Sequence, residues 1–358
     1  MTIENTSTRL WYFNHSFVCT TKEFDCNKNP EAVIRFFLYM TFASETQLGF
    51  DPTVKRCEEK GTVYFRYKVE HKFYRTIGNP IVEESAWLMN SPAVRVWTVR
   101  SVDEDCKFLE DDKEEHVLKD VWLYDDIVGE KDNQDRIIQA AKDMDAETRA
   151  KGGKASREST LQLLFLTILH DWRVQVDKDG KKADDVTLSR PGNARSLSLE
   201  AHVPLAKLKS SASTRQSEHQ APNPGTETRA ASIGLELEHH SRIHRRVVFK
   251  EKCKTFSQIG NFSLALRSLG TYVIGLNIFR EIGFLHRDIS SGNCLVYMDG
   301  TLPIPKISDL EYCKLYKDIS EHDPTTGTPE FMATEVRSKN LLFRSMSLSR
   351  QGPGASRA

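Results

Sequence analysis

Apolar residues recur at helical spacing in two segments of the chain. The first follows Asn29-Pro30-Glu31, where a capping side chain, a proline in the first turn and an acid near the positive end of the helix dipole predict a helix start. We expect this helix to run to about residue 42. The second segment ends at Gly283, and its spacing predicts one helix with an apolar face made of Phe262, Leu266, Leu269, Val273 and Leu276.

Strands are predicted where apolar and polar residues alternate with a period of two. Residues 61–70 alternate in this way. Residues 246–251 are also predicted to form a short strand. Residues 117–122 do so as well, with Val117, Lys119 and Val121 on one face. Because lysines are mostly exposed, spacing alone favours a solvated lysine on an edge strand at position 119.

Two stretches fit neither period. Residues 161–169 form a continuous apolar run, which is either a buried strand or the end of a helix. From residue 180 to about residue 238 Ser, Pro, Arg, Ala and Gln dominate and aromatic residues are absent, which predicts a mobile insertion. Three histidines lie near its end: His239, His240 and His244. They do not form an H-E-x-x-H pattern, so we interpret them as part of a solvated basic linker rather than a zinc site.

Composition narrows the class of protein. The 358 residues carry 50 Lys+Arg and 50 Asp+Glu, so the balance of charge does not favour nucleic acid or an acidic membrane surface as a partner. The 7 scattered cysteines contain no C-x-x-C pair, which favours a reducing, intracellular compartment, cytoplasmic or nuclear. No apolar run reaches the roughly 18 residues of a membrane span, and residues 1–8 lack the apolar core of a signal peptide.

The segment from His286 to Asn293 reads H-R-D-x-x-x-x-N, the pattern of a protein-kinase catalytic loop. In that pattern Asp288 accepts the proton of an attacking hydroxyl, and Asn293 holds a magnesium ion. A second acid is needed for the metal, and Asp309 follows a short apolar run where a D-F-G acid is expected. Residues 326–335 then read T-G-T-P-E-F-M-A-T-E, with A-T-E where kinases carry A-P-E.

These segments, HRDISSGN, SDLEYCK and TGTPEFMATEV, resemble the fungal-type protein kinase family. Upstream segments resemble it too: TRLWYF, RFFLYMTFASETQLGFDPTV, VLKDVW and RVVFKE. The resemblance spans most of residues 8–337 and implies an α+β, bilobal protein-kinase-like fold with a small β-rich lobe and an incomplete helical large lobe. It divides the chain into an N-terminal extension (1–79), the small lobe (80–180), a disordered insertion (181–240), the hinge with a partial large lobe (241–337) and a disordered tail (338–358).

The resemblance also assigns roles to four residues. It implies that Asp288 is the catalytic base and that Lys119, on the strand of the V-A-I-K motif, holds the nucleotide. Asn293 and Asp309 would bind magnesium. ATP and Mg²⁺ are the implied cofactors, and a protein is the implied substrate. The acid that partners the lysine stays open: Glu130 is nearest in position, ahead of a helical pattern at Ile137, Ile138, Ala141 and Met144.

Three features depart from the family pattern. Residues 88–97 match the glycine-rich loop but contain no glycine and include Pro92, which makes a poor phosphate cradle. Ser290 stands where many protein kinases carry a lysine. The chain ends soon after Glu335, which predicts a truncated large lobe with exposed apolar surface and low stability.

Three functions therefore remain open: a Ser/Thr protein kinase, a weak or inactive relative that acts as a binding module, and a small-molecule phosphotransferase. Among the neighbouring residues, His286 is expected to pack and hydrogen-bond rather than carry protons. Arg287 either pairs with the activation segment or lies on the surface. The candidates for phosphorylation in that segment are Thr325, Thr326 and Thr328.

Overall fold

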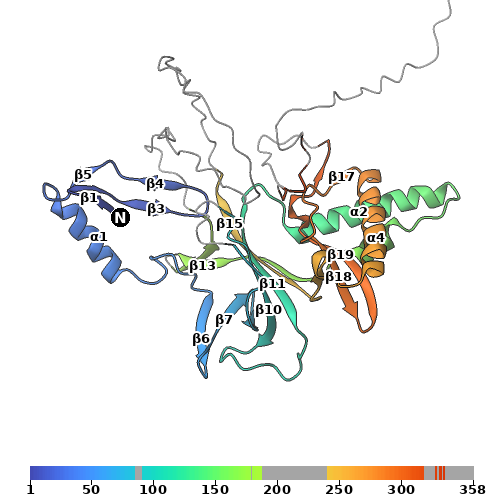
Figure 1. The fold of residues 1–358 in the computed structure, drawn as a ribbon, viewed down its shortest axis with the longest axis horizontal. Coiled ribbons are helices and arrows are strands. Elements are labelled where there is room, and N and C mark those ends of the chain that lie inside the picture. The colour runs from blue at the N-terminus through green and yellow to red at the C-terminus, as the bar shows by residue number, and fades with distance from the viewer. Residues whose placement is uncertain are drawn as a thin grey trace, which may run out of the picture.

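The computed structural model describes residues 1–84, 91–178, 180–187 and 240–317, together with residues 327, 328, 330–332 and 334. Helices and strands are both abundant, so the predicted α+β class is confirmed. Figure 1 shows a central sheet with a helical region at one side and the N-terminal strands and helix at the other. Predictions about residues 88–90, 188–239, Thr325, Thr326 and Glu335 lie outside the described residues.

The central sheet contains 8 antiparallel strands in the order β12-β15-β11-β10-β8-β7-β6, with β9 paired to β10. Its strands are β6 (Val54–Glu59), β7 (Thr62–Val69), β8 (Lys72–Thr76), β9 (Val82–Glu83), β10 (Arg95–Val102), β11 (His116–Tyr124), β12 (Ile168–Arg173) and β15 (Arg242–Phe249). The strands predicted at 61–70, 117–122 and 246–251 are thereby confirmed as β7, β11 and the end of β15.

Two strands in the middle of this sheet position the candidate site. β11 pairs with β10 along one edge and with β15 along the other, and both β11 and β15 are almost fully buried. Pairing on both edges satisfies the backbone groups of β11, and the burial of its alternate side chains shows that both of its faces are covered. Lys119 of β11 is therefore 5% exposed and is not the solvated edge lysine that spacing alone favours.

The helical region is built from three helices and several short strands. They are α2 (Glu130–Ala150), α3 (Arg157–Leu164), α4 (Phe262–Glu281), β16 (Lys254–Thr255), η1 (Phe256–Gln258), β17 (Phe284–Leu285), β18 (Cys294–Asp299), β19 (Leu302–Ile307), η2 (Leu310–Tyr312) and β20 (Lys314–Leu315). Their apolar side chains form one core, in which Phe165, Tyr272 and Phe279 are buried. A smaller cluster of Leu166 and Phe249, with Leu295 against it, joins this core to the sheet.

The apolar run at residues 161–169 contains both of the predicted states. α3 ends at Leu164, and β12 begins at Ile168 after a parallel bridge from Phe165 to Ile307. Periodicity did not separate the two because both pieces are short.

The helix predicted before Gly283 is confirmed as α4, but it packs through a different face from the predicted stripe. Phe262, Leu266 and Val273 are 77%, 52% and 59% exposed. The buried residues of the helix are instead Ser268, Tyr272, Gly275, Ile278 and Phe279. A Cβ at Gly275 would lie 2.5 Å from Leu164 Cδ1, so the glycine lets α3 approach α4 closely. Among the described helices α4 alone is long and apolar enough to cross a membrane, a test that a helix of a folded domain also passes.

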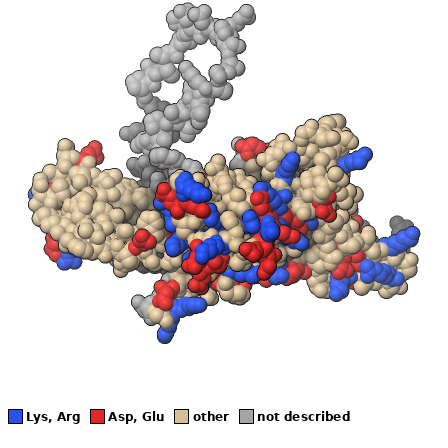
Figure 2. All heavy atoms as spheres, turned by 90° about the horizontal axis from the view of Figure 1, so that it is seen from below, with Lys and Arg blue, Asp and Glu red and all other residues tan. Residues whose placement is uncertain are grey.

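The N-terminal elements form two small sheets and one helix: β1 (Thr2–Glu4), β2 (Ser7–Arg9) and β5 (Phe24–Asp25), then β3 (Trp11–Phe13) with β4 (Val18–Thr20), then α1 (Pro30–Phe42). α1 confirms the predicted helix, although the Asn29 side chain makes no capping bond. Glu31 instead pairs with Arg35 one turn on, at 2.6 Å. α1 buries none of its residues, and Figure 2 shows few charged side chains at this end of the molecule. Over the middle of the same face acidic and basic side chains are interspersed.

The predicted insertion begins later than residue 181. β13 (Gln175–Lys178) and β14 (Lys181–Asp184) form a hairpin, and Val186 bridges to Ile243 of β15, so residues 181–187 are ordered. β6, β7 and β8 come from residues before position 80 and still belong to the same sheet as β10 and β11. The division of the chain into functional domains stays a prediction.

The interpretation of the three histidines as part of a solvated linker is wrong for His244. This residue lies in β15 and is 3% exposed. Its Nε2 is 2.8 Å from Asp120 Oδ1, and its Nδ1 is 3.1 Å from Asp185 Oδ2. The sequence did not predict the first half of this strand. Its polar residues pair with acids of β11 and of the segment after β14, which lie far away in the sequence.

Candidate active site

The segment from His286 to Asn293 connects β17 to β18 and folds back on itself. Asn293 Nδ2 donates to the backbone oxygen of Asp288 at 2.9 Å. Because the amide nitrogen of Asn293 is used inside the loop, its oxygen is the atom left for a cation. Ser290 Oγ accepts from the backbone N–H groups of Gly292 and Asn293, each at 3.2 Å. The serine that replaces a lysine therefore shapes the loop.

The carboxylate of Asp288 is held by the segment that reads T-G-T. Its Oδ1 accepts from the backbone N–H of Thr328 at 3.0 Å and from Thr328 Oγ1 at 3.1 Å. Gly327 precedes this contact at φ +118°, and a Cβ there would lie 3.1 Å from the backbone oxygen of Arg287. Glycine therefore permits the close approach of the two segments. Thr328 was predicted as a phosphorylation candidate, and in the structure its hydroxyl is engaged by the catalytic-loop acid.

His286 links this loop to the segment that carries Asp309. Its Nε2 lies 3.0 Å from the backbone oxygen of Ser308, and the Ser308 N–H donates to the backbone oxygen of Asn293 at 3.1 Å. Burial lowers the pKa of His286, and the charges of Asp309 and Asp288 oppose this shift. Both acids thus lie near enough to act on one imidazole, which itself has the packing and hydrogen-bonding role that was predicted.

Lys119 faces three carboxylates from two other elements. Its Nζ lies 2.6 Å from Asp309 Oδ1, 2.7 Å from Glu311 Oε1 and 3.5 Å from Glu130 Oε2. The lysine comes from the middle of the sheet and the acids from α2 and η2, so the site joins the sheet to the helical region (Figure 1). Asp309 is the most accessible of the three acids, with its side chain 30% exposed.

The first turn of α2 forms hydrogen bonds with residues 309–311, the segment that reads D-L-E. Glu130 Oε1 accepts from the backbone N–H groups of Asp309 and Leu310 at 3.1 and 3.3 Å. Asn133, one turn further along α2, donates through Nδ2 to the backbone oxygen of Leu310 at 2.9 Å. Asp309 itself has left-handed backbone angles, which an aspartate tolerates better than most residues. Glu130 is therefore the acid of α2 that meets Lys119.

This cluster contains more negative than positive charge. Burial alone would lower the pKa of Lys119, but the charges of Asp309, Glu311 and Glu130 outweigh it and raise that pKa well above its usual value. Burial raises the pKa of both Glu130 and Glu311; the charges of Glu311 and Asp309 add to the shift of Glu130, and the charge of Asp309 adds to that of Glu311, while Lys119 opposes both shifts. One oxygen of each buried glutamate, Oε2 in both, has no hydrogen-bond partner in the described part of the chain. Three acids against one ammonium form a site that would accept a further cation.

The segment expected to cover the phosphates is only partly described. Residues 85–90 lie outside the described residues, and β9 and β10 form the two strands that flank them. Pro92 follows, and its backbone oxygen accepts from the Trp122 N–H at 2.8 Å. The last three residues of the 88–97 segment, which read R-V-W, form the start of β10.

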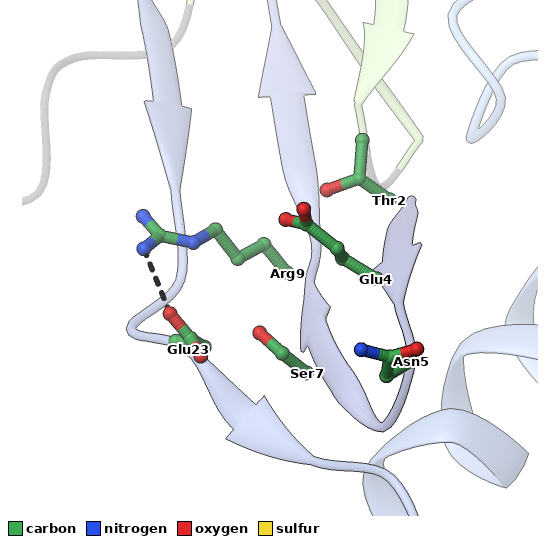
Figure 3. A pocket seen from close by; sticks show the side chains of 6 residues that line it. All are labelled: Thr2, Glu4, Asn5, Ser7, Arg9 and Glu23. Atoms are coloured by element: carbon green, nitrogen blue, oxygen red, sulfur yellow. Dashed lines mark hydrogen bonds and ion pairs between the residues drawn. The ribbon is translucent and has the colours of Figure 1, made fainter.

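A second surface feature is a polar hollow on the N-terminal sheet (Figure 3). It is lined by Thr2, Glu4, Asn5, Ser7, Arg9 and Glu23. Arg9 and Glu23 pair across it at 3.0 Å. None of the four predicted site residues lines it.

The structure thus brings Lys119 to Asp309 and Asp288 to Asn293, and His286 joins the two pairs. Sequence reasoning left Glu130 open and missed three other contributors: Asn133, Glu311 and the contact of Thr328 with the catalytic loop. Glu311 carried a usable signal, because an acid replaces the glycine of D-F-G at that position. Asn133 carried none, since an asparagine in a polar helix reads as solvated.

Comparison with known proteins agrees with this geometry. The chain shares 39% identity over 66 residues with the serine/threonine-protein kinase CST20 of Candida albicans, in strains WO-1 and SC5314. That match covers 18% of this chain and 5% of the relative, so the chain spans a small part of the curated relatives it matches. The profile of fungal protein kinases matches residues 1–341. With a match over nearly its whole length, and with the paired acids and lysine in place, the chain belongs to the fungal protein kinase family.

Proposed function

We propose that the chain is an ATP- and Mg²⁺-dependent protein kinase that transfers the γ-phosphoryl group to serine or threonine hydroxyls of proteins. The observation that carries this proposal is the meeting of Lys119 and Asp309 at 2.6 Å, across 190 positions of sequence, beside a catalytic loop closed by Asn293. A lysine and an acid in this arrangement act on the phosphates of a nucleotide in protein kinases.

The residues present fit a magnesium ion. Mg²⁺ prefers oxygen ligands, and the free amide oxygen of Asn293 and the partly exposed carboxylate of Asp309 are of that kind. The Oε2 atoms of Glu130 and Glu311 accept no hydrogen bond from the described residues, which supports a need for further positive charge in the buried cluster. Bound Mg²⁺ would neutralise charge on the phosphate oxygens of ATP.

Residues of the chain itself would bind the nucleotide, orient the substrate and accept its proton. Lys119 would shift from its acid partners to the nucleotide phosphates, because its ammonium is permanently charged in this cluster. Asp288 would orient the substrate hydroxyl and accept its proton, with Thr328 holding one of its carboxylate oxygens in place. Glu130 would keep the D-L-E segment in position through its two backbone contacts.

Two measurements test this proposal. Addition of Mg²⁺ and ATP to the purified chain is expected to raise its melting temperature, and Asp309→Asn is expected to reduce that shift. Transfer of radiolabelled phosphate from ATP to a generic protein should then exceed transfer to a small alcohol, with label on serine and threonine. Asp288→Asn should lower the transfer rate by roughly 10²–10⁴-fold. If ATP produces no shift in melting temperature, the enzyme function is wrong.

A non-catalytic binding module is the second candidate, and one observation favours it. Ser290 uses its hydroxyl inside the loop, so it adds no positive charge for the phosphoryl group in flight. This candidate predicts that ATP raises the melting temperature while no labelled phosphate reaches either acceptor. Labelling that depends on Asp288 would exclude it.

A further inference from the structure

Two cysteines far apart in the sequence meet in the sheet region. The Sγ atoms of Cys57 and Cys106 are 3.6 Å apart, and no other pair of sulfur atoms in the described residues is in hydrogen-bond contact. Cys57 lies on the edge strand β6, and Cys106 lies in the connection between β10 and β11. Sulfur atoms at this separation are in van der Waals contact.

Local hydrogen bonds hold both residues in place. β6 pairs with β7, which sets Cys57 opposite Tyr64. The connection after β10 closes into a turn, in which the Cys106 N–H donates to the backbone oxygen of Asp103 at 3.2 Å. Arg66 of β7 donates to the backbone oxygen of Glu104 and so ties this turn to the strand next to β6. The contact between the sulfurs is therefore supported from both sides.

The two thiols differ in exposure. Cys106 is buried, whereas Cys57 is half-buried on the sheet edge and so is the one that a small oxidant reaches first. Burial raises the pKa of the Cys106 thiol, the adjoining Cys57 raises it further, and the positive charges of Arg66 and Lys55 oppose this. An accessible thiol next to a second thiol is the arrangement found at redox-sensitive cysteine pairs.

We propose that Cys57 and Cys106 form a reversible disulfide when the chain meets a peroxide. The Cys57 thiol releases its proton, and the thiolate attacks one peroxide oxygen, so that an S–O bond forms as the O–O bond breaks. The hydroxide that leaves takes up this proton, giving a sulfenic acid and one water. The Cys106 sulfur then attacks the Cys57 sulfur. The S–S bond forms, and the hydroxyl leaves with the Cys106 proton as a second water. The two thiols lose two electrons and two protons in total, and the peroxide is reduced to water.

This bond would fasten the edge strand β6 to the connection between β10 and β11. The sulfurs have to close from 3.6 Å to about 2.05 Å, which rotation of the two side chains and a small shift of the turn supply. The bond would link residues 49 positions apart and so restrict the unfolded chain. Oxidation is therefore expected to raise the melting temperature by several degrees. The inference does not depend on the proposed kinase activity.

The test is a map of disulfides in the full chain. The reduced protein is treated with hydrogen peroxide, alkylated with iodoacetamide and digested with trypsin. The expected product is residues 57–60 joined to residues 101–107, two hydrogen atoms lighter than the two free peptides and absent after treatment with dithiothreitol. Cys57→Ser should abolish it, and Cys26→Ser, at a cysteine of similar exposure without a sulfur neighbour, should leave it unchanged.

Two results would overturn the proposal. The first is the absence of the joined peptide, or its appearance at the same abundance as other pairings among the seven cysteines. The second is an equal melting temperature for the oxidised and reduced wild-type chain, which would show that the bond does not fasten the strand. Cys57→Ser serves as the reference in the second measurement, because peroxide should leave its melting temperature unchanged.

Discussion

At the scale of single residues, Lys119 is the cation on which the buried cluster depends. It is the ammonium that faces Glu130, Asp309 and Glu311, and its side chain is 7% exposed. Removal of one partner from a buried ionic cluster leaves uncompensated charge. Removal of Lys119 is therefore expected to lower the stability of the folded site more than removal of any one of the three acids.

Lys119→Met is expected to lower the free energy of unfolding by roughly 3–5 kcal/mol, because it leaves three buried carboxylates without their cation. Urea denaturation measures the change. Lys252→Met is the matched control, since Lys252 pairs with Glu115 at 2.8 Å on the surface, where such a pair contributes about 1 kcal/mol or less. Similar losses in both variants would show that Lys119 is not held by the cluster in solution.

Glu311→Gln is expected to have the opposite effect and to stabilise the chain by about 1 kcal/mol. Burial disfavours the charged form of Glu311 and the charge of Asp309 adds to this effect, so the pKa of Glu311 is raised although Lys119 opposes the shift. Glutamine keeps the shape and an oxygen for Lys119 while it removes one charge. Thermal melting in Mg²⁺-free buffer measures the effect, with Glu281→Gln at a surface pair as the control. A large loss of stability in Glu311→Gln would contradict this account of the cluster.

How far the sequence predicts the site differs from residue to residue. Asp288, Asn293 and Asp309 were predicted because their spacing within short motifs is local information. The role of Lys119 was predicted from the family resemblance, since spacing alone favours a solvated lysine. The contacts of Glu130 and Asn133 with the D-L-E segment were not, because they join positions almost 180 apart and nothing in α2 marks which polar residues turn inward. Long-range pairing of polar groups is set by the fold and not by local pattern.

At the scale of elements, a stack of rings connects the N-terminal region to the sheet. Trp122 of β11 lies between two histidines, with centroid distances of 4.8 Å to His15 and 4.5 Å to His244. His15 belongs to the turn between β3 and β4. His244 has carboxylates at both ring nitrogens, Asp120 and Asp185, so both nitrogens act as donors and the ring is charged.

The pKa values of the two histidines shift in opposite directions. Burial would lower the pKa of His244, but Asp120 and Asp185 outweigh it, with Arg246 opposing them, so its folded pKa lies above 6.5. Burial lowers the pKa of His15 to about 4, and the charges of His244 and Arg242 add to this. Asp51 also lies near the His244 ring, at 3.8 Å.

These shifts predict a maximum of stability near pH 6.5. The stabilisation from charged His244 is complete below the unfolded pKa of 6.5 and is lost as the pH rises through its folded pKa. The stabilisation from neutral His15 is lost as the pH falls from 6.5 towards 4. Melting temperatures from pH 4.5 to 8.5 measure both sides.

Matched variants separate the two histidines. His244→Gln should reduce the loss on the alkaline side, part of which should remain because burial raises the pKa of Glu130 to about 8. His15→Phe, which keeps the stacking, should reduce the loss on the acid side. Part of the acid loss should remain in His15→Phe, because burial also lowers the pKa of His170 and His286. A wild-type curve that rises steadily to pH 8.5 would contradict the role of His244.

α4 and β15 show which properties of an element the sequence did not predict. The apolar stripe of α4 correctly predicted a helix, but the side that packs was decided by Gly275, whose missing Cβ admits Leu164. In β15, His244 and Arg246 look like surface residues until Asp120 of β11 is placed beside them.

At the scale of the whole molecule, the chain has a well-packed middle and two apolar outer surfaces. One core fills the helical region and another lies in the sheet, joined by a cluster around Phe249. Outside these cores α1 exposes Phe37 and Phe42, and α4 exposes Leu266 and Val273. The fold class was predictable because it depends on which elements occur. The distribution of exposed apolar surface was not, because it depends on which face each helix turns inward.

The outward face of α4 predicts a measurable property of the intact chain. Contiguous exposed apolar side chains bind hydrophobic dyes, so the wild type is expected to enhance the fluorescence of anilinonaphthalene sulfonate while it is folded. The double variant Leu266→Gln/Val273→Gln should reduce this enhancement and change the free energy of unfolding by about 0.5 kcal/mol or less per site, because both side chains are more than half exposed. Leu163→Gln, at an exposed position on α3, is the control for a single apolar residue. If the double variant instead loses as much stability as Tyr272→Ala, a change at a buried position of the same helix, then this face of α4 is covered in solution.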